Sequence, residues 1–311
     1  MPNEPISPTW SPASLRALLL LTGPLLLPLL WPQMVWLHTL IPLSVCYHLV
    51  SMGRAANSLL LKAVIISAVV ALVSQTVVLF FFGLTMLPLG YILAGGIQQR
   101  DSASWIGLKG LAYLGIFWLL LGAYAALSGG PTPLEMVQEN IDRGMATALG
   151  QEPGDAMGER EAAALAELRD FVNQAWPALF TISLLTLVWL NLLACHFLLR
   201  RRELSPWPEL RHWRLPDYFV AIAALALVLV LVKIEPAATI GLNAALVLVM
   251  LYLMQGLGVV SHLLFYWQVP PLLRGVCYAL VMLQGYGLLL LALLGLAEVR
   301  LNLRRRFVAD Q

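Results

Sequence analysis

Charged side chains are scarce in this sequence: Asp, Glu, Lys and Arg together make up 12% of its 311 residues. A soluble domain carries about 25%. The few charges are also unevenly spaced, because none occurs in the long stretches 17–53, 63–99 and 236–273. One membrane crossing needs about 20 predominantly apolar residues, and each of these stretches is longer than that. The sparse charge excludes a soluble globular protein and predicts an integral membrane protein.

Sequence motifs of catalysis and nucleotide binding are also absent. The chain contains no G-x-S-x-G, H-E-x-x-H or G-x-x-x-x-G-K-[S/T] pattern. Gly256-x-Gly258 lies in an apolar stretch and lacks the preceding strand that a nucleotide-binding fold needs. No basic stripe with interleaved aromatic residues indicates a nucleic-acid partner. We therefore expect no enzymatic activity, no catalytic residue and no cofactor.

Cysteine is rare, and its pattern does not indicate a metal site. Cys46, Cys195 and Cys277 all fall within apolar stretches, and no C-x-x-C spacing occurs. This pattern is typical of cysteines that pack as small apolar residues on helices, rather than of metal ligands or redox centres.

The apolar stretches predict an all-α, polytopic membrane protein with about nine transmembrane helices, within a range of eight to ten. The expected spans are 15–31, 34–52, 57–76, 78–98, 105–127, 174–199, 217–233, 238–266 and 271–297. Residues 1–14 contain four prolines and are expected to form a flexible tail. The division between the third and fourth spans is ambiguous, because Gly83, Pro88 and Gly90 also fit one long helix followed by a short one.

Residues 128–172 form a polar, acidic insertion. Thr132 can cap a helix, Pro133 fits the first helical position, and Glu135 can bond back to the cap. We expect two amphipathic helices lying on the membrane surface, separated by a break at Gly150–Gly158, the second ending near Asn173.

The arginines indicate orientation through the positive-inside rule. The triplet Arg200–Arg202 closes the sixth span and is expected in the cytoplasm, which places the N-terminus inside and the acidic insertion outside. Arg304–Arg306 also indicates the cytoplasm, but only three spans lie between the two triplets. Either the stretch around Gly256 crosses twice or the C-terminus faces out.

A linker at 203–216 is expected to join a six-helix module, 15–202, to a C-terminal module, 217–311. The linker contains Trp207 and Trp213 with arginines beside them. Indole rings at headgroup depth and guanidinium groups near anionic lipid are typical of a segment at the membrane interface.

Three short motifs resemble a known family. They are Pro177-Ala178-Leu179 leading to Asn191 and the arginine triplet, Trp213-Arg214-Leu215-Pro216, and Gln255–Val260 with Gly295–Glu298 and Asn302–Arg304. Together they resemble the YybS-like family of bacterial membrane proteins, a domain-of-unknown-function family, although Glu298 stands where that family has Asp. The resemblance implies an N-terminal part similar to the S components of energy-coupling-factor transporters, with the cell-shape protein MreD as a more distant relative.

Polar residues within the spans are the candidate binding residues. Asn191, Gln255 and His262 must face protein, water or each other, and Gln255 shares a helical face with His262. They can serve either as hydrogen bonds between helices or as ligand contacts. Glu298, at the end of the last span, is either a solvated acid or one half of a structural ion pair. For the pair we expect an arginine of another segment, with Arg274 or the Arg211–Arg214 stretch as candidates.

Two functions fit these observations. The first is a membrane-embedded substrate-binding or transport-related subunit whose small-molecule substrate is unknown. The second is a structural membrane scaffold in cell-envelope assembly. Both place the chain in the bacterial inner membrane as a multi-pass protein, with the lipid bilayer and other membrane subunits as partners. A polar-lined pocket containing Asn191 would favour the first function, and an apolar groove on a well-packed module would favour the second.

Overall fold

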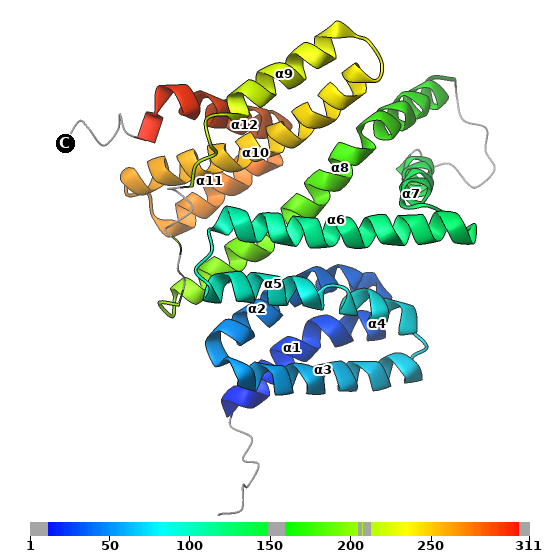
Figure 1. Ribbon diagram of the computed structural model, residues 1–311, viewed down its shortest axis with the longest axis vertical. Coiled ribbons are helices and arrows are strands. Elements are labelled where there is room, and N and C mark those ends of the chain that lie inside the picture. The colour runs from blue at the N-terminus through cyan, green and yellow to red at the C-terminus, as the bar shows by residue number, and fades with distance from the viewer. Residues whose placement is uncertain (1–11, 149–158, 205–206, 208–212, 305–311) are drawn as a thin grey trace, which may run out of the picture. The chain divides into compact units, whose positions relative to one another are not determined.

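The computed structural model describes residues 12–148, 159–204, 207 and 213–304, and these contain helices and turns but no strand. This confirms the all-α fold. The helices are α1 (Pro12–Leu30), the 3-10 helix η1 (Pro32–Leu40), α2 (Ile41–Met52), α3 (Arg54–Val73), α4 (Val77–Leu84), α5 (Leu87–Gln98), α6 (Ala103–Ser128), α7 (Pro133–Ala148), α8 (Glu159–Arg200), α9 (Phe219–Val232), α10 (Ala237–Tyr266), α11 (Pro271–Leu283) and α12 (Gly285–Leu301) (Figure 1).

Six helical segments in the described residues are long and apolar enough to cross a membrane. They are Pro32–Met52, Arg54–Val73, Val77–Gln98, Ala103–Ser128, Ala166–Arg200 and Ala237–Tyr266. Two of the other three expected spans do not meet this standard, and the third meets it only if a bent pair of helices counts as one span. The apolar part of α1 and the whole of α9 are short, and α11 and α12 form a pair bent by 105°. A helix of 14 residues, such as α9, is about 21 Å long, less than the hydrocarbon thickness of about 30 Å. Nine spans are therefore not confirmed.

The chain divides into two compact units. The first comprises Met1–Phe117 and Leu184–Trp207, and the second comprises Trp118–Ser183 and Pro208–Gln311. The sequence instead predicts one module at 15–202. The difference arises because α8 is one continuous helix of 42 residues. Its first part belongs with the C-terminal helices and its last part with the N-terminal ones.

The first unit combines an apolar core with polar bonds between its helices. Its fully buried side chains include Leu25, Leu29, Leu89 and Leu93. Ser44 of α2 donates to the carbonyl of Leu20 on α1 at 2.7 Å, and Gln98 at the end of α5 donates to the carbonyl of Leu49 on α2 at 3.3 Å. These hydrogen bonds fix the positions of α1, α2 and α5 along one another, which apolar packing alone specifies less strictly.

Cys46 of α2 and Cys195 of α8 are in contact inside this unit. Their sulfur atoms are 2.7 Å apart, and neither side chain is exposed. A disulfide bond is about 2.05 Å long. We expect copper–phenanthroline oxidation of membranes to join this pair, so that the denatured protein keeps one alkylatable thiol, Cys277, instead of three. Mass spectrometry of the alkylated protein measures the number. A Cys46→Ala variant should keep both remaining thiols, and full alkylation of the oxidised wild type would contradict this packing of α2 on α8.

The polar insertion begins as the sequence indicates. The backbone N–H of Thr132 donates to Glu135 Oε2 at 2.6 Å, and the N–H of Glu135 donates to Thr132 Oγ1 at 3.3 Å. This is a reciprocal capping box at the start of α7. Two side-chain contacts then join α7 to the first part of α8: Gln138 with Asn173, and Asp142 with Arg169. The expected second helix is therefore not separate from the sixth span, because α8 continues through Asn173 to Arg200. The expected break at 150–158 lies outside the described residues.

The capping box makes the start of α7 sensitive to acid. Its hydrogen bonds to Thr132 lower the pKa of Glu135. Because the pKa of Glu135 is lower in the folded protein than in the unfolded chain, where it is about 4.3, the cap contributes its full stability above that unfolded-chain pKa. This contribution is lost as the pH falls through the pKa of Glu135 in the folded protein. We expect the first turn of α7 to become more accessible to protease as the pH is lowered from neutral to 3. Limited proteolysis at each pH measures this, with a protein that resists pepsin as the control. Glu135→Gln should reduce this pH dependence, and an unchanged pH response in that variant would contradict the assignment.

Candidate functional site

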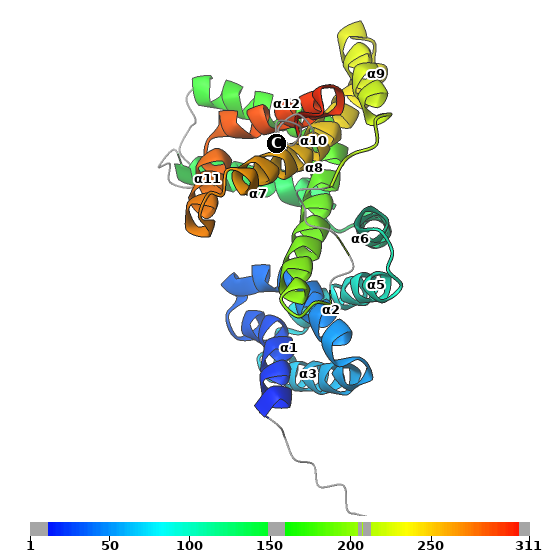
Figure 2. The same ribbon diagram turned by 90° about the vertical axis from the view of Figure 1, so that its left-hand side faces the viewer.

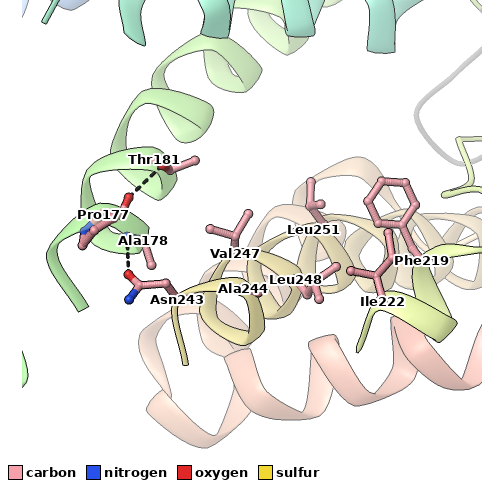
Figure 3. A pocket seen from close by; sticks show the side chains of 10 residues that line it. All are labelled: Pro177, Ala178, Thr181, Phe219, Ile222, Asn243, Ala244, Val247, Leu248 and Leu251. Atoms are coloured by element: carbon pink, nitrogen blue, oxygen red, sulfur yellow. Dashed lines mark hydrogen bonds between the residues drawn. The ribbon is translucent and has the colours of Figure 1, made fainter. Parts of the chain in front are cut away.

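The second unit contains a polar bridge at a proline in α8. Proline in a helix has no N–H to donate, and its ring clashes with the carbonyl four residues earlier. Next to Pro177, the side chain of Asn243 on α10 bonds to two backbone groups of α8 that lie four residues apart, the N–H of Ala178 and the carbonyl of Gln174 (Figure 3). Its Oδ1 accepts from the N–H of Ala178 at 2.8 Å, and its Nδ2 donates to the carbonyl of Gln174 at 2.7 Å. Because an unpaired backbone group in hydrocarbon costs several kcal/mol, Asn243 both repairs α8 and ties it to α10.

An apolar groove lies beside this bridge, with a volume of about 360 Å³. Its lining comes from α8, α9 and α10: Pro177, Ala178, Thr181, Phe219, Ile222, Asn243, Ala244, Val247, Leu248 and Leu251 (Figure 3). The two polar side chains of this lining are both bonded to backbone. Thr181 donates to the carbonyl of Pro177 at 2.7 Å, and Asn243 also donates to the carbonyl of Thr239 at 2.8 Å. The groove therefore offers mainly apolar surface to an occupant.

Replacing Asn243 with leucine should separate α8 from α10. The carbonyl of Gln174 and the N–H of Ala178 would both lose a partner, and a buried polar group without one costs about 1–3 kcal/mol. We expect a fall in unfolding free energy of that size, measured by thermal unfolding in detergent. Thr181→Val is the matched control, because among the described residues the Thr181 hydroxyl bonds within α8 and not to another helix. Equal stability of the two variants would argue against a bridging role.

A second polar cluster forms where α10 crosses α12, and α9 lies along the same helix (Figure 2). Gln255 of α10 is completely buried. Its Oε1 accepts from the N–H of Leu215 at 3.0 Å, and its Nε2 donates to the carbonyl of Gly295 at 2.9 Å. The side chain thus joins three parts of the chain: α10, α12 and the segment before α9.

Arg304 completes this cluster. Asn302 ends α12 in the left-handed conformation, with φ of 47°, and the chain then turns back. Arg304 donates from Nη1 to the carbonyl of Trp213 at 2.9 Å and from Nη2 to the carbonyl of Gln255 at 3.4 Å. Its Nε lies 3.5 Å from Oε1 of Glu298, whose side chain is 1% exposed. Burial lowers the pKa of the Arg304 guanidinium, and the nearby Glu298 carboxylate opposes that shift.

The arginine beside Glu298 is not one of the two candidates from the sequence. Arg304 comes from the same end of the chain, six residues on, and reaches back because of the turn at Asn302. Arg274 instead donates to the carbonyl of Val269. Within the Arg211–Arg214 stretch, Arg211 lies outside the described residues.

The other expected site residues make different contacts. Asn191 belongs to the first unit and is 4% exposed. Its Nδ2 donates to the carbonyl of Thr39 on η1 at 3.0 Å, which is an interhelical bond, and to the carbonyl of Leu187 within α8 at 2.9 Å. The indole N–H of Trp207 donates to the carbonyl of Asp101 at 2.8 Å. His262 is half-buried on α10, about 10 Å along the axis from Gln255 by the helical rise.

Three of the expected residues therefore meet in one place: Gln255, Glu298 and Trp213, the last through its carbonyl. The sequence did not predict Arg304 in this cluster, nor Asn243 in the bridge to α8. A proline in the middle of an apolar stretch was the available signal for Asn243, since the freed backbone groups need a partner. In the sequence, Arg304 appeared as part of a positive-inside triplet and of a motif of the family resemblance.

The long apolar helices and the hydrogen bonds between them define a polytopic α-helical membrane protein. The profile of a family described as "Predicted membrane protein (DUF2232)" matches residues 16–299, and the chain belongs to that family. No curated protein and no solved structure matches the chain significantly.

Proposed function

We propose that this protein is a structural membrane scaffold, without enzymatic activity, that binds other membrane proteins through helix contacts. The observation that carries the proposal is the use of the polar side chains in its helices. Asn191, Asn243 and Gln255 each bond to the backbone of another segment. A small-molecule site needs a few convergent polar groups available to the ligand, and these side chains already hold helices together.

The groove between α8, α9 and α10 supplies the binding surface in this proposal. Helices associate in membranes through close packing rather than through a hydrophobic driving force, so an apolar concavity suits a helix of a second membrane protein. We place this scaffold in the bacterial inner membrane, in cell-envelope assembly, as the family resemblance implies.

A substrate-binding or transport-related subunit is the second candidate, and two observations favour it. The groove volume of about 360 Å³ lies within the range of small-molecule pockets, about 300–1,000 Å³. Asn191 Oδ1 also has no hydrogen bond in the described part of the chain. This subunit would resemble the S components of energy-coupling-factor transporters and would need a separate chain to supply energy.

Cross-linking in intact membranes, followed by purification and mass spectrometry, separates the two candidates. A scaffold should recover a defined membrane protein, with cross-links on the groove. Val247→Trp, which fills the groove, should reduce that recovery at least fivefold. Leu289→Trp on α12 is the control, because Leu289 is 54% exposed and does not line the groove. Recovery of a bound small molecule that is lost in Val247→Trp or Asn191→Leu, with no partner chain, would support the transport subunit instead.

A further inference from the structure

A second cavity, distinct from the apolar groove, lies between the start of α9 and the end of α12. Its volume is about 300 Å³, and its lining is Asp217, Val220, Val299 and Arg300. An acid and a base thus contribute to the same small space. The side chains of Asp217 and Arg300 take part in none of the described hydrogen bonds of the Gln255 cluster.

The two charges are not paired with protein groups. Neither the Asp217 carboxylate nor the Arg300 guanidinium has an ion-pair or hydrogen-bond partner in the part of the chain that the structure describes. Both residues are exposed. They line one cavity yet do not reach each other within the 4 Å of an ion pair, so a ligand carrying both a cation and an anion could bridge them.

The surroundings of the cavity indicate the membrane interface. Asp217 immediately precedes the apolar helix α9, and Arg300 stands in the last turn of the apolar helix α12. Charges at the ends of apolar helices lie near lipid headgroups. Tyr218, beside Asp217, is 62% exposed, and an exposed aromatic ring with a polar end is typical of this depth.

We propose that this cavity binds the headgroup of phosphatidylethanolamine. Its phosphate is the anion for Arg300, whose planar guanidinium donates two parallel hydrogen bonds to phosphate oxygens. Its primary ammonium is the cation for Asp217, and it has N–H donors for the carboxylate. Phosphatidylcholine carries the same charges, but its quaternary ammonium has no N–H to donate. Phosphatidylglycerol has the phosphate without the cation. The cavity therefore discriminates among lipids through Asp217 and attracts phospholipids in general through Arg300.

Native mass spectrometry of the full-length protein, titrated with the three lipids carrying identical acyl chains, tests the proposal. We expect the wild type to bind phosphatidylethanolamine about fivefold more tightly than phosphatidylcholine, since one exposed ion pair contributes an effect of that order. Asp217→Asn should abolish this preference while keeping the affinity for phosphatidylglycerol. Arg300→Gln should weaken the binding of all three lipids.

Two exposed charges of the first unit serve as controls, Glu203→Gln and Arg54→Gln, and both should bind as the wild type does. Equal binding of phosphatidylethanolamine and phosphatidylcholine to the wild type would overturn the proposal. A preference for phosphatidylethanolamine that survives Asp217→Asn would also overturn it. A preference of the wild type for phosphatidylglycerol would overturn it too, because it would show only attraction of an anionic lipid to Arg300. Because the site does not include the apolar groove, these outcomes are independent of the scaffold function.

Discussion

Replacing Arg304 with methionine is expected to destabilise the protein by about 3–5 kcal/mol, the usual effect of removing one member of a buried ion pair. The side chain of Glu298 is 1% exposed and that of Arg304 is 9% exposed. Without the guanidinium, the Glu298 carboxylate stays buried with no countercharge. The carbonyls of Trp213 and Gln255 also lose a donor.

A double variant separates the lost charge from the lost packing. Glu298→Gln combined with Arg304→Met removes both charges, so it should recover a large part of the stability lost in the single variant. Arg300→Met is the control, because Arg300 is exposed and unpaired among the described residues, and it should change stability by no more than about 0.5 kcal/mol. The unfolding free energy of each variant is measured in detergent, with tryptophan fluorescence as the signal. A double variant less stable than Arg304→Met would show that the ion pair is not the cause.

Replacing Gly256 with alanine is expected to force α10 and α12 apart. A Cβ atom at Gly256 would lie 1.9 Å from the carbonyl oxygen of Leu291, and one at Gly295 would lie 2.0 Å from that of Tyr252. Both obstacles are backbone atoms, which cannot rotate away as a side chain can. Overpacking costs about 1–3 kcal/mol, occasionally more. We expect about 3 kcal/mol for Gly256→Ala, since separating the helices also stretches the Gln255–Gly295 hydrogen bond.

Gly275→Ala on α11 is the matched control. A Cβ there meets nothing within 4 Å, and alanine favours a helix more than glycine does by about 1 kcal/mol. This variant should be neutral or slightly stabilising. Thermal unfolding midpoints of the two variants in the same detergent give the comparison, and a midpoint for Gly256→Ala equal to that of the wild type would contradict the close approach of α10 and α12.

The features that the sequence predicts best are those with local causes. The expected spans are largely helical, apart from breaks such as the bend between α11 and α12, because a backbone in hydrocarbon must satisfy its own hydrogen bonds. The capping box at Thr132 and Glu135 forms as expected because all its atoms lie within one turn. Membrane character likewise follows from composition alone, without knowledge of any contact.

The features that the sequence does not predict depend on contacts between distant residues. The polar composition of the insertion predicted a separate helix ending near Asn173. Instead α8 continues through Asn173 to Arg200, and Asn243, 65 positions from Ala178, bonds to its backbone beside Pro177. The position of Arg304 beside Glu298 depends on the left-handed backbone of Asn302, which an asparagine permits but does not require. The division into two units depends in the same way on which helices each half of α8 meets.

The helix α8 is longer than one bilayer crossing requires. Its 42 residues correspond to about 63 Å of helix, whereas the hydrocarbon layer is about 30 Å thick. A single helix of this length that crosses the layer without a break extends well beyond it at one end or both. The charged first turns, from Glu159 to Asp170, indicate the end that we expect in water, and α7 is attached there through Asp142 and Arg169. We therefore expect α7 and the first turns of α8 to lie together outside the hydrocarbon layer.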